Sequence, residues 1–599
     1  MALLPTSSDD VRSARPLRFA RQFDLDEPVR LEHGGELPSV TVTYETYGRL
    51  SDNADNAVLV CHAITGDSHV ARHDDEDEPG WWDAIVGPGK PIDTDRYFVI
   101  CPNALGGCRG TTGPNSINPA TGKPYGRDFP VITVGDMVAV QRKLLDHLGI
   151  PKLRAVVGGS LGGHQALTWA TRYPEVVGGA AAIATSPRLT SQALGFDVIG
   201  RNAILRDPNF NNGQYYDQEQ GPDVGLALAR MLGHITYLSR EAMTAKFDPD
   251  RFQPRDVPTE FEKKFSVGSY LAHQGHKFVE RFDANSYVTL SMAMDLFSLG
   301  KTQEELAKTF AGSTLPWLVI SFSSDWLFPP MQSRQMVSAL LDADREVTYC
   351  EVTSPSGHDA FLLDDSLDRY GELMRAFLHN RQVDVEQQPL DAGAEQHHPT
   401  SIYHARRLDY DTIIDLIEPG SSVLDLGCGQ GGLLARLKRR NHRRLVGVEL
   451  DEHAIVTCTQ RGLNVIQHDI NSGLEPFARA QFDYVVLSQT LQAVANVDEL
   501  IAEILRVGKK CIVSFPNAAY EPLRQRLAEQ GRAPVAFAGG YQWYNTPNIR
   551  QLSIADFDVF CEHKGITVHR ATYLDTEAGE LIEADPNLRA DAAVYVISR

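Results

Sequence analysis

The stretch that decides the fold of the N-terminal part is Ala155-Val156-Val157-Gly158-Gly159-Ser160-Leu161-Gly162-Gly163-His164. A β-branched run meets a serine that has glycines two residues to either side. This G-x-S-x-G pattern is typical of a nucleophile elbow, a sharp turn between a strand and a helix where larger side chains would clash. Such a turn exposes the Ser160 hydroxyl and leaves the Leu161 amide free to bind an oxyanion. A glycine-rich turn can also serve packing alone, so the remaining catalytic groups decide between the two.

Two later strands each lead to one group that a serine nucleophile needs. Residues 317–322 read as a buried strand and are followed by Asp325, and residues 346–352 read as the next strand and are followed by His358. The order Ser, acid, His is that of α/β-hydrolases, where the histidine takes the serine proton and the acid fixes its tautomer. The sequence therefore predicts an α/β-hydrolase fold with Ser160, Asp325 and His358 as a catalytic triad.

Composition limits the other classes of function. The chain has 599 residues, which predicts at least two domains, and a net charge of −21. This acidic balance argues against nucleic acid or an anionic membrane surface as a partner. The eight cysteines are scattered without zinc spacing, so no metal site is expected. The chain shows no signal peptide and no long apolar run, so we expect a cytoplasmic protein.

The turn that follows the predicted strand at residues 57–62 is the expected place of a second oxyanion donor. This turn, residues 63–67, stands where an α/β-hydrolase supplies the second backbone amide. We predict that this donor is Ile64, with Ala63 as the alternative. The domain is expected to span residues 21–380, after a disordered start at residues 1–20.

A long insertion separates the nucleophile from the acid. Many more residues lie between Ser160 and Asp325 than the intervening elements of a minimal hydrolase need. The region from about 185 to 312 reads as helical, most clearly at residues 223–239 and 283–299, which predicts a helical lid. Arg230 carries a cation on one of these apolar helices. Considered alone, such an arginine is more often a salt-bridge partner than a ligand.

Several segments resemble homoserine O-acyltransferases of the MetX type. The resemblance covers about residues 15–380 and rests on His62 to Asp67, Asn103 to Ser116, Asp128 to Pro130, Asp136 to Val138, Gly158 to Gly163, Arg230 to Leu238 and Gly357 to Phe361. It implies acyl transfer from acyl-CoA to the hydroxyl of L-homoserine through an acyl-enzyme on Ser160, in methionine biosynthesis. It also implies that Arg230 binds the substrate carboxylate and that Asp359 binds the substrate. We expect a homodimer.

The resembling family divides between acetyl-CoA and succinyl-CoA as acyl donor. Leu327 lies two residues after Asp325, in a loop expected to border the acyl pocket, and relatives that use succinyl-CoA can carry arginine there. A second carboxylate is costly to bury without a cation or several donors. Leucine offers neither, so position 327 favours acetyl-CoA, although Arg109 or a lid arginine could serve instead. A hydrolase would share the triad, but the lid with Arg230 favours transfer.

A second domain follows a predicted linker at residues 381–400. A strand at residues 422–426 leads into a glycine pattern, D-x-G-x-G-x-G, whose residues are Asp425, Gly427, Gly429 and Gly431. The next strand ends in Glu449, at the distance where an acid can accept ribose hydroxyls. The pattern resembles class I S-adenosylmethionine methyltransferases, in which the position of Asp469 contacts adenine. S-adenosylmethionine is therefore the expected ligand.

Residues 401–599 also resemble the MetW family. The motifs are Arg406 to Ile414, Ser488 to Gln492, Ser514 to Asn517 and Tyr541 to Asn548. MetW-like proteins are associated with MetX-like ones, so the fusion supports both resemblances. No residue stands out as a base for a methyl acceptor. Two interpretations therefore stay open for this domain: a methyltransferase, and a ligand-binding or activating module.

Overall fold

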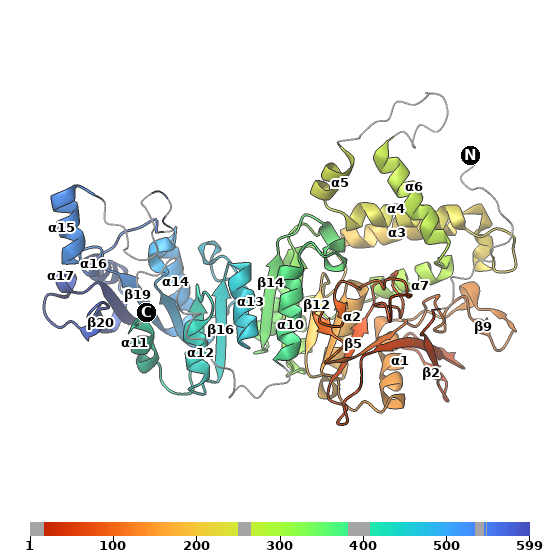
Figure 1. Ribbon diagram of the computed structural model, residues 1–599, viewed down its shortest axis with the longest axis horizontal. Helices are drawn as coiled ribbons and strands as arrows, with labels where there is room; N and C mark the ends of the chain where they lie inside the picture. The colour runs from red at the N-terminus through yellow and green to blue at the C-terminus, as the bar shows by residue number, and fades with distance from the viewer. Residues whose placement is uncertain (1–16, 249–264, 381–407, 533–543, 545, 547) are drawn as a thin grey trace. The chain divides into compact units, whose positions relative to one another are not determined.

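The computed structural model describes residues 17–248, 265–380, 408–532, 544, 546 and 548–599 (Figure 1). Contacts divide the chain into one unit of residues 1–346 and 351–381 and a second of residues 347–350 and 382–599. The expected linker at residues 381–400 lies outside the described residues, as does most of the expected disordered start. Over the described ranges, no helix combines the length and apolar character needed to cross a bilayer.

The first unit is built on a sheet with the strand order β1-β4-β8-β5-β11-β12-β13, and β14, whose residues are divided between the two units, comes next in the order. The strands are β1 (Arg21–Asp24), β4 (Thr41–Tyr47), β5 (Ala57–Cys61), β8 (Phe98–Pro102), β11 (Ala155–Gly159), β12 (Ala180–Ile183), β13 (Trp317–Phe322) and β14 (Val347–Val352). Strands β8, β5, β11, β12 and β13 run parallel, and β4 pairs antiparallel with both β1 and β8. Every residue of β5 and β11 is buried, as expected for parallel strands covered on both faces.

Helices pack around this sheet. They are α1 (Val134–His147), α2 (Leu161–Arg172), α8 (Gln303–Ala311), α9 (Pro330–Asp342) and α10 (Glu372–His379). Helix α2 contacts β5, β11 and β12, and α1 packs against α2. Three two-stranded ladders join β2 (Val29–Arg30) to β3 (Glu36–Leu37), β6 (Val86–Gly87) to β7 (Ile92–Asp93) and β9 (Ile117–Asn118) to β10 (Lys123–Pro124). This arrangement confirms the predicted α/β-hydrolase fold.

The insertion between β12 and β13 is helical, as its sequence indicates. It contains α3 (Ser191–Leu205), α4 (Asp223–Tyr237), α5 (Arg240–Phe247), α6 (Ser266–Val279) and α7 (Ala284–Asp295). Helix α4 packs against both α3 and α6, and α3 also contacts α7. In Figure 1 these helices form a layer above the sheet, with α7 beneath the others. Residues 249–264 of the predicted lid lie outside the described residues.

The second unit has its own sheet, with the order β17-β16-β15-β18-β19-β22-β20-β21. Its strands are β15 (Ser422–Leu426), β16 (Arg444–Glu449), β17 (Asn464–Gln467), β18 (Phe482–Ser488), β19 (Gly508–Pro516), β20 (Thr567–Asp575), β21 (Glu580–Leu581) and β22 (Ala592–Ser598). Strands β15 to β19 run parallel, and β22 enters antiparallel between β19 and β20. The predicted Rossmann-like fold is confirmed.

Helices surround this second sheet. They are α11 (Leu408–Leu416), α12 (Gly432–Lys438), α13 (Glu452–Gln460), α14 (Val497–Val507), α15 (Glu521–Gln530), α16 (Ile554–Lys564) and α17 (Pro586–Arg589). Apolar residues of α11 and α12 pack with β15, β18 and β22 in a buried cluster that includes Ile413, Leu433 and Val594. The cluster fixes the glycine loop, because that loop joins β15 to α12.

Candidate active site

Ser160 occupies the sharp turn between β11 and α2. Its backbone has φ +58° and ψ −124°, a conformation that L-residues rarely adopt. A Cβ atom at Gly158 would lie 2.1 Å from the Gly162 carbonyl oxygen, and one at Gly162 would lie 2.0 Å from the Cys61 carbonyl oxygen. Both glycines are therefore sterically required, which is the geometry of a nucleophile elbow.

His358 and Asp325 form a buried hydrogen-bonded pair. His358 Nδ1 donates to Asp325 Oδ2 over 2.8 Å, and both side chains are almost completely inaccessible to solvent. Burial lowers the pKa of His358, but the Asp325 charge and hydrogen bond outweigh it, so this pKa lies above its usual value. With Nδ1 bonded to Asp325, the second ring nitrogen is available as a base.

The pair lies next to the pocket that contains Ser160. Tyr237 and Phe328 both line that pocket. The His358 ring lies 5.9 Å from the Tyr237 ring and 5.1 Å from the Phe328 ring, between centroids. The fold therefore brings the three predicted triad residues to one place, from strand ends that are far apart in the sequence.

The turn after β5 is held in a fixed shape. The Ala104 amide donates to His62 Nε2 over 2.9 Å, and Gln165 donates to the His62 carbonyl over 3.2 Å. Ile64 lines the pocket together with Ser160, and Leu161 is the first residue of α2. Both predicted oxyanion donors thus belong to segments that border the nucleophile.

Two lid arginines converge on Thr65, in this same turn. Arg230 Nη1 donates to Thr65 Oγ1 over 3.4 Å, and Arg281 Nη1 donates to the Thr65 carbonyl over 3.0 Å. The Arg230 guanidinium also lies 4.9 Å from the Phe278 ring centroid and 5.6 Å from that of Tyr237. Such aromatic packing holds a guanidinium in place while leaving charge for a ligand.

A partly buried carboxyl group, that of Asp359, lies near these arginines. Burial raises the pKa of Asp359, and the charges of His358 and Arg230 offset this only in part. Burial and the charge of Arg230 lower the pKa of Arg281. A pair of arginines near a carboxyl group has the charges that complement a zwitterionic amino acid. Arg281 and Tyr237 were not among the residues expected at the site, although Tyr237 follows Arg230 by seven residues and so shares its helix face.

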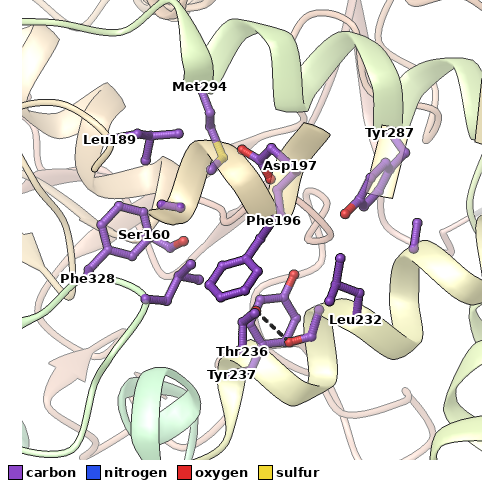
Figure 2. Close-up of a pocket in the computed structure, with 15 residues that line it drawn as sticks. Ser160, Leu189, Phe196, Asp197, Leu232, Thr236, Tyr237, Tyr287, Met294 and Phe328 are labelled. Atoms are coloured by element: carbon purple, nitrogen blue, oxygen red, sulfur yellow. Dashed lines mark hydrogen bonds between the residues drawn. The ribbon is translucent and has the colours of Figure 1, made fainter. Parts of the chain in front are cut away.

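Figure 2 shows the pocket in which Ser160 lies. It encloses about 500 Å³ of unfilled space, part of it open to solvent. The lining residues are Ile64, Ser160, Leu189, Ala193, Phe196, Asp197, Ala229, Leu232, Gly233, Thr236, Tyr237, Tyr287, Met294, Leu327 and Phe328. Leu327 thus borders the pocket, as its place after Asp325 indicates. None of these described lining residues is Lys, Arg or His. Arg109 lies elsewhere, with Nε 3.6 Å from Asp67 Oδ2.

A cluster of titratable groups lies at the start of the chain. One oxygen of buried Glu45 accepts from His69 Nδ1 at 3.0 Å, His73 Nε2 at 2.9 Å and the Tyr47 hydroxyl at 2.9 Å. Burial opposes ionisation of Glu45, but these hydrogen bonds outweigh it and lower the pKa to about 2. Burial also lowers the pKa of His69, yet its bonds to Glu45 and to the Glu78 carbonyl raise it to about 9. His69 and Glu45 are therefore an ion pair at neutral pH.

These three groups also have the geometry of a metal site. The ligand atoms of Glu45, His69 and His73 lie within 4.8 Å of one another. The same atoms form the charge-assisted network just described, with the ring protons directed at the carboxylate. The hydrogen bonds from His69 and His73 to Glu45 hold the loop after β5 against β4, and we assign them that structural role.

The glycine loop of the second unit has the predicted conformation. Gly427, Gly429 and Gly431 have φ of +69°, +53° and +77°, which L side chains rarely adopt. Asp425 is 3% exposed at the end of β15. Glu449 turns back onto the loop, because one of its oxygens accepts from the Gly429 amide at 2.7 Å. These residues meet at the carboxyl end of the parallel strands.

The acids beyond this loop are partly engaged by backbone. The second oxygen of Glu449 accepts the amides of Leu450 at 2.7 Å and Asp451 at 3.0 Å. A carboxylate has about four acceptor positions, so Glu449 retains capacity for one ligand hydroxyl. Asp469 accepts from the backbone and the side chain of Asn471 at 2.9 and 3.0 Å.

Comparison with known proteins assigns both units. The family model "alpha/beta hydrolase fold" matches residues 56–365, and "Methionine biosynthesis protein MetW" matches residues 407–597. A bifunctional methionine biosynthesis protein MetXA/MetW of Rhodopirellula baltica is 54% identical over 99% of this chain and 95% of its own length. A homoserine O-acetyltransferase of Desulfotalea psychrophila is 51% identical over 60% of this chain and 93% of its own. A homoserine O-succinyltransferase of Alkalilimnicola ehrlichii is 49% identical over 63% and 97%.

Solved structures agree for the first unit. The homoserine O-acetyltransferase of Bacillus anthracis is 30% identical, with a TM-score of 0.53 over 60% of this chain and 98% of its own. Esterase E22 is 32% identical, with a TM-score of 0.55 over 60% of this chain and 99% of its own. On these grounds the chain belongs to the bifunctional MetXA/MetW family, in which a homoserine O-acyltransferase unit of the α/β-hydrolase fold is joined to a MetW unit.

Proposed function

We propose that this protein transfers an acetyl group from acetyl-CoA to the hydroxyl of L-homoserine, in methionine biosynthesis. The observation that carries the proposal is the buried His358–Asp325 pair beside Ser160 on its strained turn. The two arginines on Thr65 supply what an amino-acid acceptor needs. Both features agree with the acyltransferase names of the relatives.

In the first half-reaction His358 takes the Ser160 proton as the hydroxyl attacks the thioester carbonyl. The amides of Leu161 and Ile64 stabilise the oxyanion. When the tetrahedral intermediate collapses, the C–S bond breaks and protonated His358 gives its proton to the leaving CoA thiolate. The product is an acyl-enzyme ester on Ser160 and free CoA.

In the second half-reaction homoserine binds with its carboxylate on Arg230 and Arg281 and its ammonium group near Asp359. His358 takes the proton from the homoserine hydroxyl, whose oxygen attacks the acyl ester. Collapse of the second intermediate returns the proton to Ser160 and releases the O-acyl amino acid. Binding the acceptor in this way favours its attack over that of water.

Intact-mass spectrometry tests the scheme directly. Mixing the protein with acetyl-CoA should add one acetyl group and release one CoA thiol, and Ser160→Ala should do neither. Adding homoserine should discharge the adduct. An adduct on another residue, or normal turnover by Ser160→Ala, would overturn the assignment.

Ester hydrolysis is the second candidate, because esterase E22 has the same fold at 32% identity. It uses the same triad and differs in the acceptor. The two functions separate in one measurement, the discharge of acetylated Ser160 with and without homoserine. We expect homoserine to accelerate discharge, whereas equal rates would assign the protein as an esterase.

Acetyl-CoA is the proposed donor because Leu327 borders the pocket and no cation lines it among the described residues. A relative named as a succinyltransferase shows that both donors occur among similar chains. Arg109 is occupied by Asp67, which removes one cation that could hold a succinyl carboxylate. A greater kcat/KM for succinyl-CoA would reject this choice.

We propose that the MetW unit binds S-adenosylmethionine or a related nucleoside. The three left-handed glycines open the loop to a ligand, Asp425 and Glu449 lie at the strand ends, and Asp469 follows β17. Whether this ligand serves methyl transfer or activation of the first unit is tested by adding it to the acyltransferase assay. A rise in homoserine turnover without methylated product supports activation.

A homodimer and a cytoplasmic location complete the proposal. Exposed apolar side chains occur on three lid helices, namely Val198 and Ile199 of α3, Leu228 and Ile235 of α4, and Met292 of α7, with Leu296 directly after α7. Such a surface suits a second copy of the chain. Light scattering should give twice the 66.2 kDa chain mass, and Leu228→Lys should lower it. Cell fractionation should place the protein in the cytoplasmic fraction.

A further inference from the structure

An acidic side chain lines the otherwise apolar pocket beside Ser160. Asp197 extends from α3, and Figure 2 shows its carboxyl group between Met294 and Tyr287. Its Oδ2 atom is buried and receives no hydrogen bond from any group that the structure describes. A carboxylate in this position would be costly, because nothing there compensates for its lost hydration.

The group that Asp197 faces is a second carboxyl, on α7. Asp295 lies within hydrogen-bonding reach of Asp197, and its Oδ1 atom likewise has no donor among the described residues. Arg201 forms an ion pair with Asp295 and donates to the Ser291 hydroxyl over 2.9 Å. Two carboxyl groups in contact ionise together only at high cost, so the pair shares one proton.

The protonation of the pair follows from these contacts. Burial, then the hydrogen bond and charge of Asp295, raise the pKa of Asp197 to about 8, and Arg201 opposes them. At neutral pH the two acids and Arg201 therefore carry no net charge. Above this pKa they carry one negative charge in the pocket wall.

We propose that Asp197, held by Asp295 and Arg201, is a specificity-determining residue that excludes acyl groups bearing a free carboxylate from the pocket beside Ser160. The inference rests on the proposed acyltransferase function. A succinyl group would bring a third carboxylate against a pair that has one proton to share, in a pocket without a cationic lining residue. An acetyl group meets no such penalty. Leu327 offers the carboxylate no partner, whereas Asp197 repels it once ionised, so the exclusion is strongest above the pKa of Asp197.

Single-turnover acylation of Ser160 tests the proposal. Rate constants with acetyl-CoA and succinyl-CoA are measured by intact mass for the wild type, Asp197→Asn and Glu241→Gln, an exposed acid of lid helix α5. At pH 9, where Asp197 is ionised, the acetyl-to-succinyl ratio should fall about tenfold or more in Asp197→Asn, because a like charge near the acyl carboxylate is removed. It should not change in Glu241→Gln.

The pH dependence of the same ratio supplies a second readout. In the wild type the ratio should rise between pH 7 and 9, as the pair loses its shared proton. Asp197→Asn should show a flat ratio over this range. Asp295→Asn should move the rise to lower pH, because the hydrogen bond and charge of Asp295 no longer add to burial in raising the pKa of Asp197. Thermal melts show whether each variant is folded.

The outcomes separate this inference from the function on which it rests. A wild type that forms no Ser160 adduct with acetyl-, propionyl- or succinyl-CoA refutes the acyltransferase function. Acylation by acetyl-CoA with an unchanged ratio in folded Asp197→Asn refutes the role of Asp197 alone. A rise in the KM for homoserine without a change in the ratio also refutes it, since Asp197 would then bind the substrate ammonium group.

Discussion

The carboxylate of Asp325 holds His358 and its own loop at the same time. Oδ2 accepts from His358 Nδ1, while Oδ1 accepts the backbone amides of Leu327 at 3.0 Å and Phe328 at 2.9 Å. The orientation of the catalytic imidazole is thereby coupled to the loop that borders the acyl pocket. Phe328 then packs against the imidazole, so that the base is fixed by the acid and by the residue that the acid positions.

Asp325→Asn should lower kcat by about ten-thousand-fold, as loss of the acid does in other triads, because Asn can stabilise the wrong tautomer. The wild-type rate of Ser160 acylation should increase with pH through a pKa above the ordinary histidine value, since the base must be neutral. In the variant this pKa should fall, because the Asp325 charge that raises it is absent. A pH-rate profile of single-turnover acylation measures both effects. An unchanged profile would contradict the proposed pairing.

Arg230→Lys and Arg281→Lys should each lower kcat/KM for homoserine by about 10- to 100-fold, because an ammonium group cannot replace a guanidinium on a planar carboxylate. The rate of Ser160 acylation by acetyl-CoA should stay close to that of the wild type. Arg240→Lys, at an exposed lid position, is the matched control. Equal losses in both half-reactions would assign the two arginines to folding of the lid.

The Glu45–His69 pair should make the stability of the fold depend on pH in both the acidic and the alkaline range. The pKa of His69 is raised to about 9, so its contribution is complete below its ordinary value near 6.5 and disappears as the pH rises through 9. The pKa of Glu45 is lowered to about 2, so its contribution disappears as the pH falls from about 4.5 through 2. Glu45→Gln should cost about 3 to 5 kcal/mol, because it leaves the buried pair broken.

Tryptophan fluorescence measures how the unfolding midpoint of the first unit depends on pH. Five of the six tryptophans, Trp81, Trp82, Trp169, Trp317 and Trp326, belong to it. The unfolding midpoint should decline between pH 6.5 and 9 in the wild type and change less in Glu45→Gln. Identical pH profiles for the two proteins would refute the charged pair.

Glu449→Gln should weaken binding of S-adenosylmethionine by about tenfold, because an amide offers fewer acceptor positions to ribose and alters the bond to the Gly429 amide. Calorimetry on the full chain with S-adenosylmethionine and S-adenosylhomocysteine is the measurement. Glu452→Gln, on the neighbouring helix α13, is the control. If the folded wild type binds neither compound, the proposal that the MetW unit binds S-adenosylmethionine is wrong. Only a regulatory role without this ligand would then be left for the unit.

The places of the proposed triad residues and of the glycine loop could be predicted because each lies in the loop after a buried strand. Parallel strands end at one edge of the sheet, so chain order alone brings Ser160, Asp325 and His358 together. Arg281 and Asp197 were not predictable, because both depend on how lid helices pack. The rotation of α3 that points Asp197 into the pocket is set by contacts with α4 and α7 and leaves no pattern in the local sequence.

The backbone conformation of Ser160, with φ +58°, lowers the stability of the fold in exchange for an exposed nucleophile. A non-glycine residue in such a conformation costs on the order of 1–3 kcal/mol, which the packed strands and helices around it must supply. Glycine adopts the conformation without strain, so Ser160→Gly should yield a more thermostable but inactive protein. Selection for stability alone would thus remove the nucleophile. The presence of serine at this position records selection for turnover, and any stabilised variant of the enzyme should gain its stability elsewhere in the fold.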